Sequence, residues 1–284
     1  MIGLLLAALL AFSAAAAQAQ TGAIPVIEIP GPGVTQELEL NDGSSVIGRV
    51  ESIDTGRFVF RSTAGVEMTV DVSAVRSLQP VTGRIVNGEL WREDPNTTRL
   101  FFGPTGRALK KGEVYFGVYE VLLPFVQVGI TDRFSIGGGT PLVFGDFDRV
   151  LWVTPKFQVV RQGSLTAAVG VMHFFNIDEA STGIAYGAVT KGSTDSAVTV
   201  GLGYAYARTD EEDAGSGVVM LGGEHRVSRR IKLVTENHAF KGGGFASAGI
   251  RLFGEKLSAD FGMVLPLFGE EFILLPMINI VRKF

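Results

Sequence analysis

Seven ionisable residues in the second half of the chain alternate with apolar residues, a spacing that places them on one face of each β-strand. They are Lys156, Glu224, Arg226, Lys232, Glu236, Arg251 and Asp260. Charges of both signs on the inside of a closed sheet can line an aqueous path and set its preference for ions or solutes. They can instead pair across the interior as salt bridges and fill it. The sequence leaves both interpretations open.

The histidines are His173, His225 and His238. A hydrolase would need a serine and a carboxylate arranged around one of them. The alternation puts His173 on the outward face of its strand, but Ser164 and Ser181 belong to no nucleophile motif. We therefore predict no catalytic residue and no enzyme activity, and we assign His238 and Glu236 to the interior charge network.

No pattern in the chain indicates a metal or a cofactor. The acidic run at 208–217 has oxygen ligands that could hold calcium, but it lacks EF-hand spacing, and a solvated loop is the favoured interpretation. The glycine triplets at 137–139 and 242–244 precede no helix, so they are not phosphate-binding loops. Cysteine is absent, which excludes disulfides, and a net charge of −4 spread over both signs argues against a nucleic-acid partner.

The chain begins like an exported protein. Residues 1–19 combine an apolar run with a terminal Ala-Gln-Ala, the pattern of a cleaved signal peptide. We expect residues 20–35 to form a Pro/Gly-rich linker. Residues 36–80 then contain four short alternating runs separated by Asn/Asp-Gly turns, which predict a small all-β module resembling an SH3 or Sm barrel. Such a periplasmic module could be a spacer or could bind a partner, and residues 81–111 would connect it to the rest.

Residues 112–284 show a longer alternation that predicts about twelve strands. Most are near the 9–11 residues that cross a bilayer as tilted strands, and tight turns mostly alternate with longer polar loops. The predicted segments are 112–120, 122–131, 133–143, 150–161, 164–175, 181–191, 196–207, 216–227, 229–238, 244–253, 256–266 and 271–283. An even number of strands puts both ends of the barrel on the periplasmic side.

The faces of these strands fit a membrane barrel better than a soluble sandwich. In 196–207, Val198, Val200 and Leu202 share one face, while Thr199 and Gly201 share the other. A sandwich would bury the apolar face, whereas a barrel turns it to lipid and puts small or charged residues in the lumen. Glycine on a solvent face would only weaken a sandwich, but in a lumen it relieves crowding. We predict an all-β protein with a C-terminal transmembrane antiparallel barrel in the bacterial outer membrane, in contact with its lipid.

The last strand carries the features of an outer-membrane sorting signal. Phe284 ends the sequence, and Ile280 and Ile278 precede it on the same face. We expect these residues to be read by the barrel-assembly machinery, although Arg282 stands where that signal usually has an apolar residue.

Residues 96–116, NTTRLFFGPTGRALKKGEVYF, followed by GITDRFSIGGG and WVTPKFQV, resemble a family of uncharacterised outer-membrane barrels of Bacteroidetes-type bacteria. The resemblance covers roughly residues 96–284. It implies an integral outer-membrane location but brings no substrate or catalytic residue with it.

The sequence is consistent with three functions. The leading hypothesis is a passive or narrowly selective channel for small solutes. The alternatives are a non-conducting barrel whose periplasmic module binds a partner, and a barrel-borne lipid hydrolase. The sequence gives neither the solute nor the oligomeric state, and it leaves open whether residues 97–111 enter the lumen as a plug.

Overall fold

The computed structural model of the protein describes residues 27–31, 33–81, 83–142, 150–177, 180–208, 213–268 and 272–284. The chain divides into two compact units, Met1–Leu90 and Trp91–Phe284. The predicted signal peptide, half of the predicted linker (20–26 and 32) and residues 209–212 of the acidic run lie outside the described residues. No helix of the described part is long and apolar enough to cross a membrane.

The first unit contains a five-stranded antiparallel sheet in the order β4-β3-β2-β1-β5. Its strands are β1 (Thr35–Leu40), β2 (Ser45–Asp54), β3 (Arg57–Ser62), β4 (Glu67–Asp71) and β5 (Val75–Val81), with a 3₁₀ turn at Val72–Ala74 before β5. Gly43 and Gly56 have φ values of 86° and 76° in the turns that join β1 to β2 and β2 to β3, a conformation that glycine adopts without strain. The four predicted strands are present. The fifth, β5, is not predicted by periodicity because VRSLQPV does not alternate.

The module has a small hydrophobic core of its own. Leu38, Val50, Phe58 and Phe60 are almost fully buried there, and Val70 and Val75 complete the cluster. The region that follows, predicted as a plain connector, holds a short hairpin of β6 (Arg84–Val86) and β7 (Glu89–Trp91).

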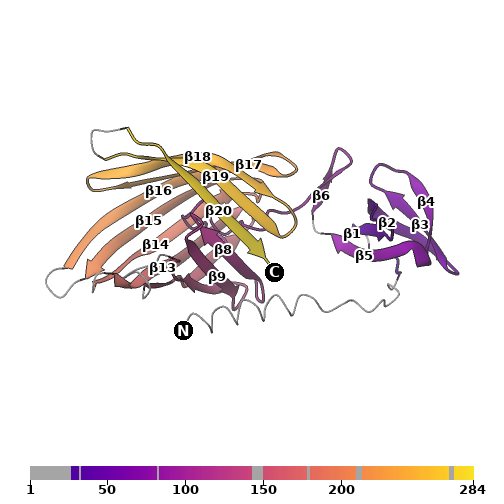
Figure 1. Cartoon of the computed structure of the whole chain (residues 1–284), viewed down its shortest axis with the longest axis horizontal. Coiled ribbons are helices and arrows are strands. Elements are labelled where there is room, and N and C mark those ends of the chain that lie inside the picture. Colours follow the sequence, from indigo (N-terminus) through magenta and orange to yellow (C-terminus); the bar gives the residue numbers. More distant parts are fainter. Residues whose placement is uncertain are drawn as a thin grey trace. The chain divides into compact units, whose positions relative to one another are not determined.

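The second unit is a closed antiparallel barrel of twelve strands (Figure 1). The strands are β8 (Val114–Tyr119), β9 (Leu123–Gly129), β10 (Phe134–Gly139), β11 (Leu151–Val153) with β12 (Lys156–Gln162), β13 (Leu165–Ile177), β14 (Ala180–Gly192), β15 (Ser196–Arg208), β16 (Asp213–Ser228), β17 (Ile231–Phe240), β18 (Gly243–Phe253), β19 (Leu257–Pro266) and β20 (Leu275–Lys283). β11 and β12 are one strand interrupted at Thr154 and Pro155, since both pair with β13. β20 pairs with β8, with Ile280 opposite Val118, and this pairing closes the barrel.

The twelve predicted strands are confirmed, each end lying within four residues of its observed position. The predicted long connection after β17 is instead a tight turn at Lys241 and Gly242. The alternation of faces also holds: Leu202 on β15 is 66% exposed on the outside, whereas Thr199 is buried inside. Apolar side chains therefore cover the outer wall, and polar ones point inward.

The module core allows a direct test of its independence from the barrel. Phe60→Ala should destabilise the module by about 3–5 kcal/mol, because it removes a fully buried ring and leaves a cavity. Hydrogen exchange on the full chain should show faster exchange across β1 to β5 and no change in β13 to β16. Val66→Ala, at an exposed position, serves as the control. Loss of protection in the barrel as well would contradict two separately folded units.

Candidate functional site

The barrel interior is occupied by the chain itself. Residues 92–111, here called the lumenal hairpin, precede β8 and contact inward-facing side chains of at least six strands. The hairpin turns at its tip, where the Leu100 amide donates to the Gly103 carbonyl at 2.9 Å and the Thr105 amide donates to Thr98 at 3.0 Å. The question left open by the sequence is thus answered, and the second half of the predicted connector belongs to the barrel unit.

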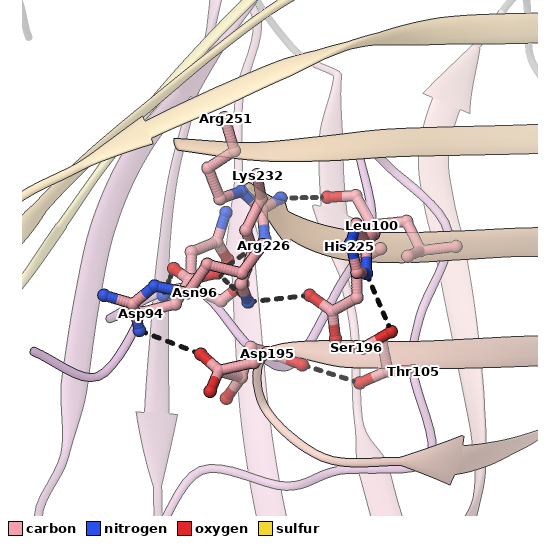
Figure 2. Close-up of polar contacts among 12 residues, drawn as sticks. Asp94, Asn96, Leu100, Thr105, Asp195, Ser196, His225, Arg226, Lys232 and Arg251 are labelled. Carbon is pink, nitrogen blue, oxygen red and sulfur yellow. Dashed lines mark hydrogen bonds and ion pairs between the residues drawn. The ribbon is translucent and has the colours of Figure 1, made fainter. Parts of the chain in front are cut away.

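A buried ionic cluster holds the N-terminal arm of the hairpin (Figure 2). Asp94 lies 2.7 Å from Lys232 Nζ and 3.3 Å from the Arg251 guanidinium. Lys232 also contacts Glu224 at 2.9 Å, and Arg251 contacts Asp260 at 2.6 Å. Lys232 and Arg251 are both fully buried. Charges taken out of water in this way require partners, and the hairpin supplies one of them.

Arg251 also binds the backbone of the hairpin. Its guanidinium donates to the carbonyl oxygens of Asn96 and Leu100 while keeping two bonds to Asp260. The planar five-donor group of arginine can make these contacts simultaneously, which a lysine ammonium could not.

Glu236 holds the tip. Its Oε2 accepts hydrogen bonds from three consecutive amides, those of Phe101, Phe102 and Gly103, at 2.8, 3.0 and 2.9 Å. Its Oε1 lies 2.8 Å from His238 Nε2. Successive backbone N–H groups that converge on one oxygen form an anion-binding nest, so this single carboxylate fixes the turn of the hairpin in place.

The C-terminal arm is held by polar contacts to several strands of the wall. The Gly106 amide donates to Thr190 Oγ1 at 2.8 Å, and Gln158 donates to the Gly106 carbonyl at 2.9 Å. Arg107 pairs with Glu224. A Cβ on Gly106 would lie 2.3 Å from the Thr166 carbonyl oxygen, so the backbone can approach the wall this closely only at a glycine.

Arg99 forms a separate anchor within the hairpin. Its guanidinium lies 4.2 Å from the centre of the Phe125 ring and donates to Gln127 at 2.9 Å and to the Tyr119 hydroxyl. A buried cation over an aromatic face contributes favourably, about 2 kcal/mol when desolvated.

All seven predicted interior residues are buried and point into the barrel. Besides Glu236, four of them (Glu224, Lys232, Arg251 and Asp260) contact the hairpin or its ionic partners as described. Arg226 and Lys156 complete the set by donating to the carbonyls of Arg92 and Thr98 at 2.8 Å. In the described part of the chain these residues are buried against the hairpin inside the lumen. Their role in selectivity stays a prediction.

Sequence reasoning missed the hairpin half of the site. Asp94, Arg99 and Arg107 each pair with the wall, yet they lie in a stretch with no strand periodicity. The available signal was their charge itself, because three ionisable residues within fourteen positions precede a barrel whose interior carries charges of both signs.

Asp94 belongs to the hairpin and not to a strand. Burial alone would raise its pKa, but Arg251, Lys232 and the hydrogen bonds from Lys232 and the Asn96 amide lower the pKa from 3.8 to about 2. Because the pKa is lower in the folded protein, the stabilisation from Asp94 is present above pH 3.8 and is lost as the pH falls through about 2. Mild acid therefore leaves this carboxylate ionised.

The other predicted features lie on the outside. His173 Nδ1 is 2.8 Å from the Tyr206 hydroxyl, so its described partner is a tyrosine and not a serine. His225 lies 3.1 Å from Ser196, at an exposed position (Figure 2). The predicted sorting signal is exposed: Ile278 and Ile280 lie on β20, and Phe284 follows it. Its recognition by the assembly machinery stays a prediction.

Comparison with known proteins finds distant structural likenesses to outer-membrane barrels. No family model and no curated protein sequence matches it. Among solved structures, the NanC porin has a TM-score of 0.43 at 8% identity and covers 61% of this chain and 98% of its own. An outer membrane channel from Pseudomonas putida F1 has a TM-score of 0.42 at 13% identity, covering 63% and 97%. An anion-selective porin from Comamonas acidovorans has a TM-score of 0.35 at 11% identity, covering 88% and 97%. Likeness at this level says nothing about the function of this barrel.

From the ionic cluster we predict that removing one wall charge, that of Lys232, loosens the hairpin. Lys232→Met leaves Asp94 without its nearest partner, and breaking a buried ion pair on one side costs about 3–5 kcal/mol. Hydrogen exchange by mass spectrometry should show loss of protection in residues 92–111 with protection retained in β14 and β15. Lys191→Met, at an exposed position, is the matched control. Unchanged protection in the hairpin would show that the cluster does not hold it.

Proposed function

We propose that this protein is an outer-membrane β-barrel channel that its own lumenal hairpin closes. One observation carries the proposal: charged residues of the wall hold residues 92–111 within the lumen. Withdrawal of the hairpin gives the conducting state, and the wall charges that it leaves behind then set the preference for small solutes.

The outer wall supports the membrane location. Val198, Val200 and Leu202 on β15 and Leu221 on β16 are each about half exposed or more, on the outside of a closed sheet. An apolar band of this kind would be unfavourable in water, and the pairing of β20 with β8 joins the two edges of the sheet. The predicted signal peptide gives the route of export.

The contacts of the hairpin support reversible closure. Its ion pairs and hydrogen bonds can be replaced by bonds to water, while release also exposes Leu100, Phe101 and Leu109, which pack in apolar clusters inside the barrel. The buried Asn96 side chain makes no hydrogen bond to the described protein through either amide atom, nor does Asn279 Oδ1 on the facing wall. Unsatisfied buried polar groups cost free energy in the seated state and favour release.

A second function is supported by the same burial. With Lys232 and Arg251 fully buried under the hairpin, the barrel could remain closed and serve as a membrane anchor for the module. In that case the module, resembling SH3 or Sm domains, would bind a periplasmic partner through residues 36–80. Conductance separates the two functions.

Planar-bilayer recordings test the channel directly. The native chain should be closed most of the time, and Glu236→Gln should open more often because the three tip amides lose a charged acceptor. Replacing residues 97–108 by a Gly/Ser linker should give a persistently open pore. In that background Lys232→Ala and Glu236→Ala should shift the ion preference in opposite directions.

The control for the charge change is Glu67→Gln, an exposed position in the module. Circular dichroism and heat-modifiable gel migration establish that each variant is folded. A folded and inserted linker variant that conducts no current would overturn the channel and leave the anchor function.

The membrane location has a test of its own on the outer wall. Leu202→Arg should destabilise the barrel in lipid vesicles by about 2–4 kcal/mol, the cost of a lipid-facing arginine near the bilayer midplane. Urea titration of folding into vesicles measures the difference from Leu202→Ala. If Leu202→Arg lowers the free energy of unfolding no more than Leu202→Ala does, this face lies in water. Val66→Arg in the module controls for the added charge.

A further inference from the structure

A cavity of about 410 Å³ lies beyond the tip of the hairpin. Its walls come from β16 to β20, and the ring of Phe102 on the hairpin tip contributes to its lining. The wall residues are mostly apolar and include Val218, Phe240, Phe245, Val264 and Met277. The volume falls within the range of small-molecule sites, which are mostly apolar with a few placed polar groups.

Three polar residues line this apolar space, Glu236, His238 and Ser247, and the Ser247 hydroxyl already donates to the Glu236 carbonyl. His238 and Glu236 both line the cavity, and the His238 side chain keeps 26% of its surface exposed. Glu236 makes four hydrogen bonds, three from tip amides and one with His238 Nε2, so it has little capacity left for a ligand. Because a carboxylate only accepts, the proton of a neutral His238 lies on Nε2. Nδ1 is then left as an acceptor, and it makes no hydrogen bond with the described residues.

We propose that this cavity binds a small, largely apolar molecule carrying a single hydroxyl group that donates to His238 Nδ1. The aromatic and aliphatic walls take the apolar body, and the imidazole takes the hydroxyl. An anionic ligand is disfavoured by the Glu236 carboxylate beside the imidazole. A cationic ligand is disfavoured because that carboxylate is already satisfied by its four donors.

The site is linked to the hairpin through two residues. Phe102 lines the cavity only while the hairpin is seated, and Glu236 orients His238 with one oxygen while holding the tip with the other. A ligand that binds only this arrangement stabilises it by mass action. Bound ligand should therefore keep the hairpin in the lumen. The binding site itself does not depend on whether the barrel conducts.

Calorimetry on the full chain in lipid nanodiscs tests the site, with empty nanodiscs as the reference for partitioning into lipid. The probe is 4-propylphenol, and 4-propylanisole is its matched analogue without the hydroxyl donor. The phenol should bind at one site per chain, and the anisole should bind at least about tenfold more weakly, since a lost hydrogen bond to a buried acceptor is worth roughly that factor. Phenol binding should also slow hydrogen exchange in residues 92–111.

Two variants separate the polar and apolar parts of the site. His238→Phe should weaken the phenol at least about tenfold and remove its preference over the anisole. Val218→Trp should fill the cavity and abolish binding of both compounds. His173→Phe, on the outer wall, should bind like the native chain. Binding no greater than to empty nanodiscs, or binding unaffected by both cavity variants, would overturn the proposal while leaving the conductance test untouched.

Discussion

The structure depends on the pairing of desolvated charges between the barrel wall and a segment that belongs to no strand. Lys232 and Arg251 are fully buried, and Asp94 of the hairpin is a shared partner of both. An uncompensated buried charge would cost several kcal/mol, so the wall and the hairpin each supply the charged partner that the other requires inside the barrel. A lumen lined only by apolar residues would impose no such dependence. The charges on the wall are thus the reason that the interior is ordered.

Most of the fold follows from strand periodicity, and most of the site does not. Alternation along the chain decides where each strand lies and which side faces inward, as at Thr199 and Leu202, because closure imposes the same two-residue repeat everywhere. Residues 92–111 show no two-residue repeat, so periodicity does not predict their path. It is set by long-range contacts, such as those of Glu236 with amides about 135 residues earlier, and by glycines such as Gly106 that permit close approach. β5 escapes prediction for the same reason, since its residues do not alternate.

The carboxylate of Glu236 has two tasks that are normally given to separate residues. One oxygen binds the hairpin tip and the other orients His238 toward the cavity. Any change in the protonation, position or identity of this side chain therefore affects both its bonds to the tip amides and its bond to His238. Coupling between two sites requires an element with two arrangements whose balance both sites influence. Glu236 meets this requirement because it contacts both the hairpin and His238. The Glu236–His238 pair and the hairpin tip are in this sense one unit.

The pairing of the first and last strands has a consequence for biogenesis. β8 follows the hairpin directly, and its remaining edge is satisfied only by β20, the final strand of the sequence. Until that seam is sealed the growing sheet is open along one side, and the hairpin can dock laterally onto strands that are already formed. Once it is sealed, the same segment could enter only through an end of the cylinder. The seam thus makes the order in which strands and hairpin come together, and not equilibrium alone, a determinant of whether the interior is occupied.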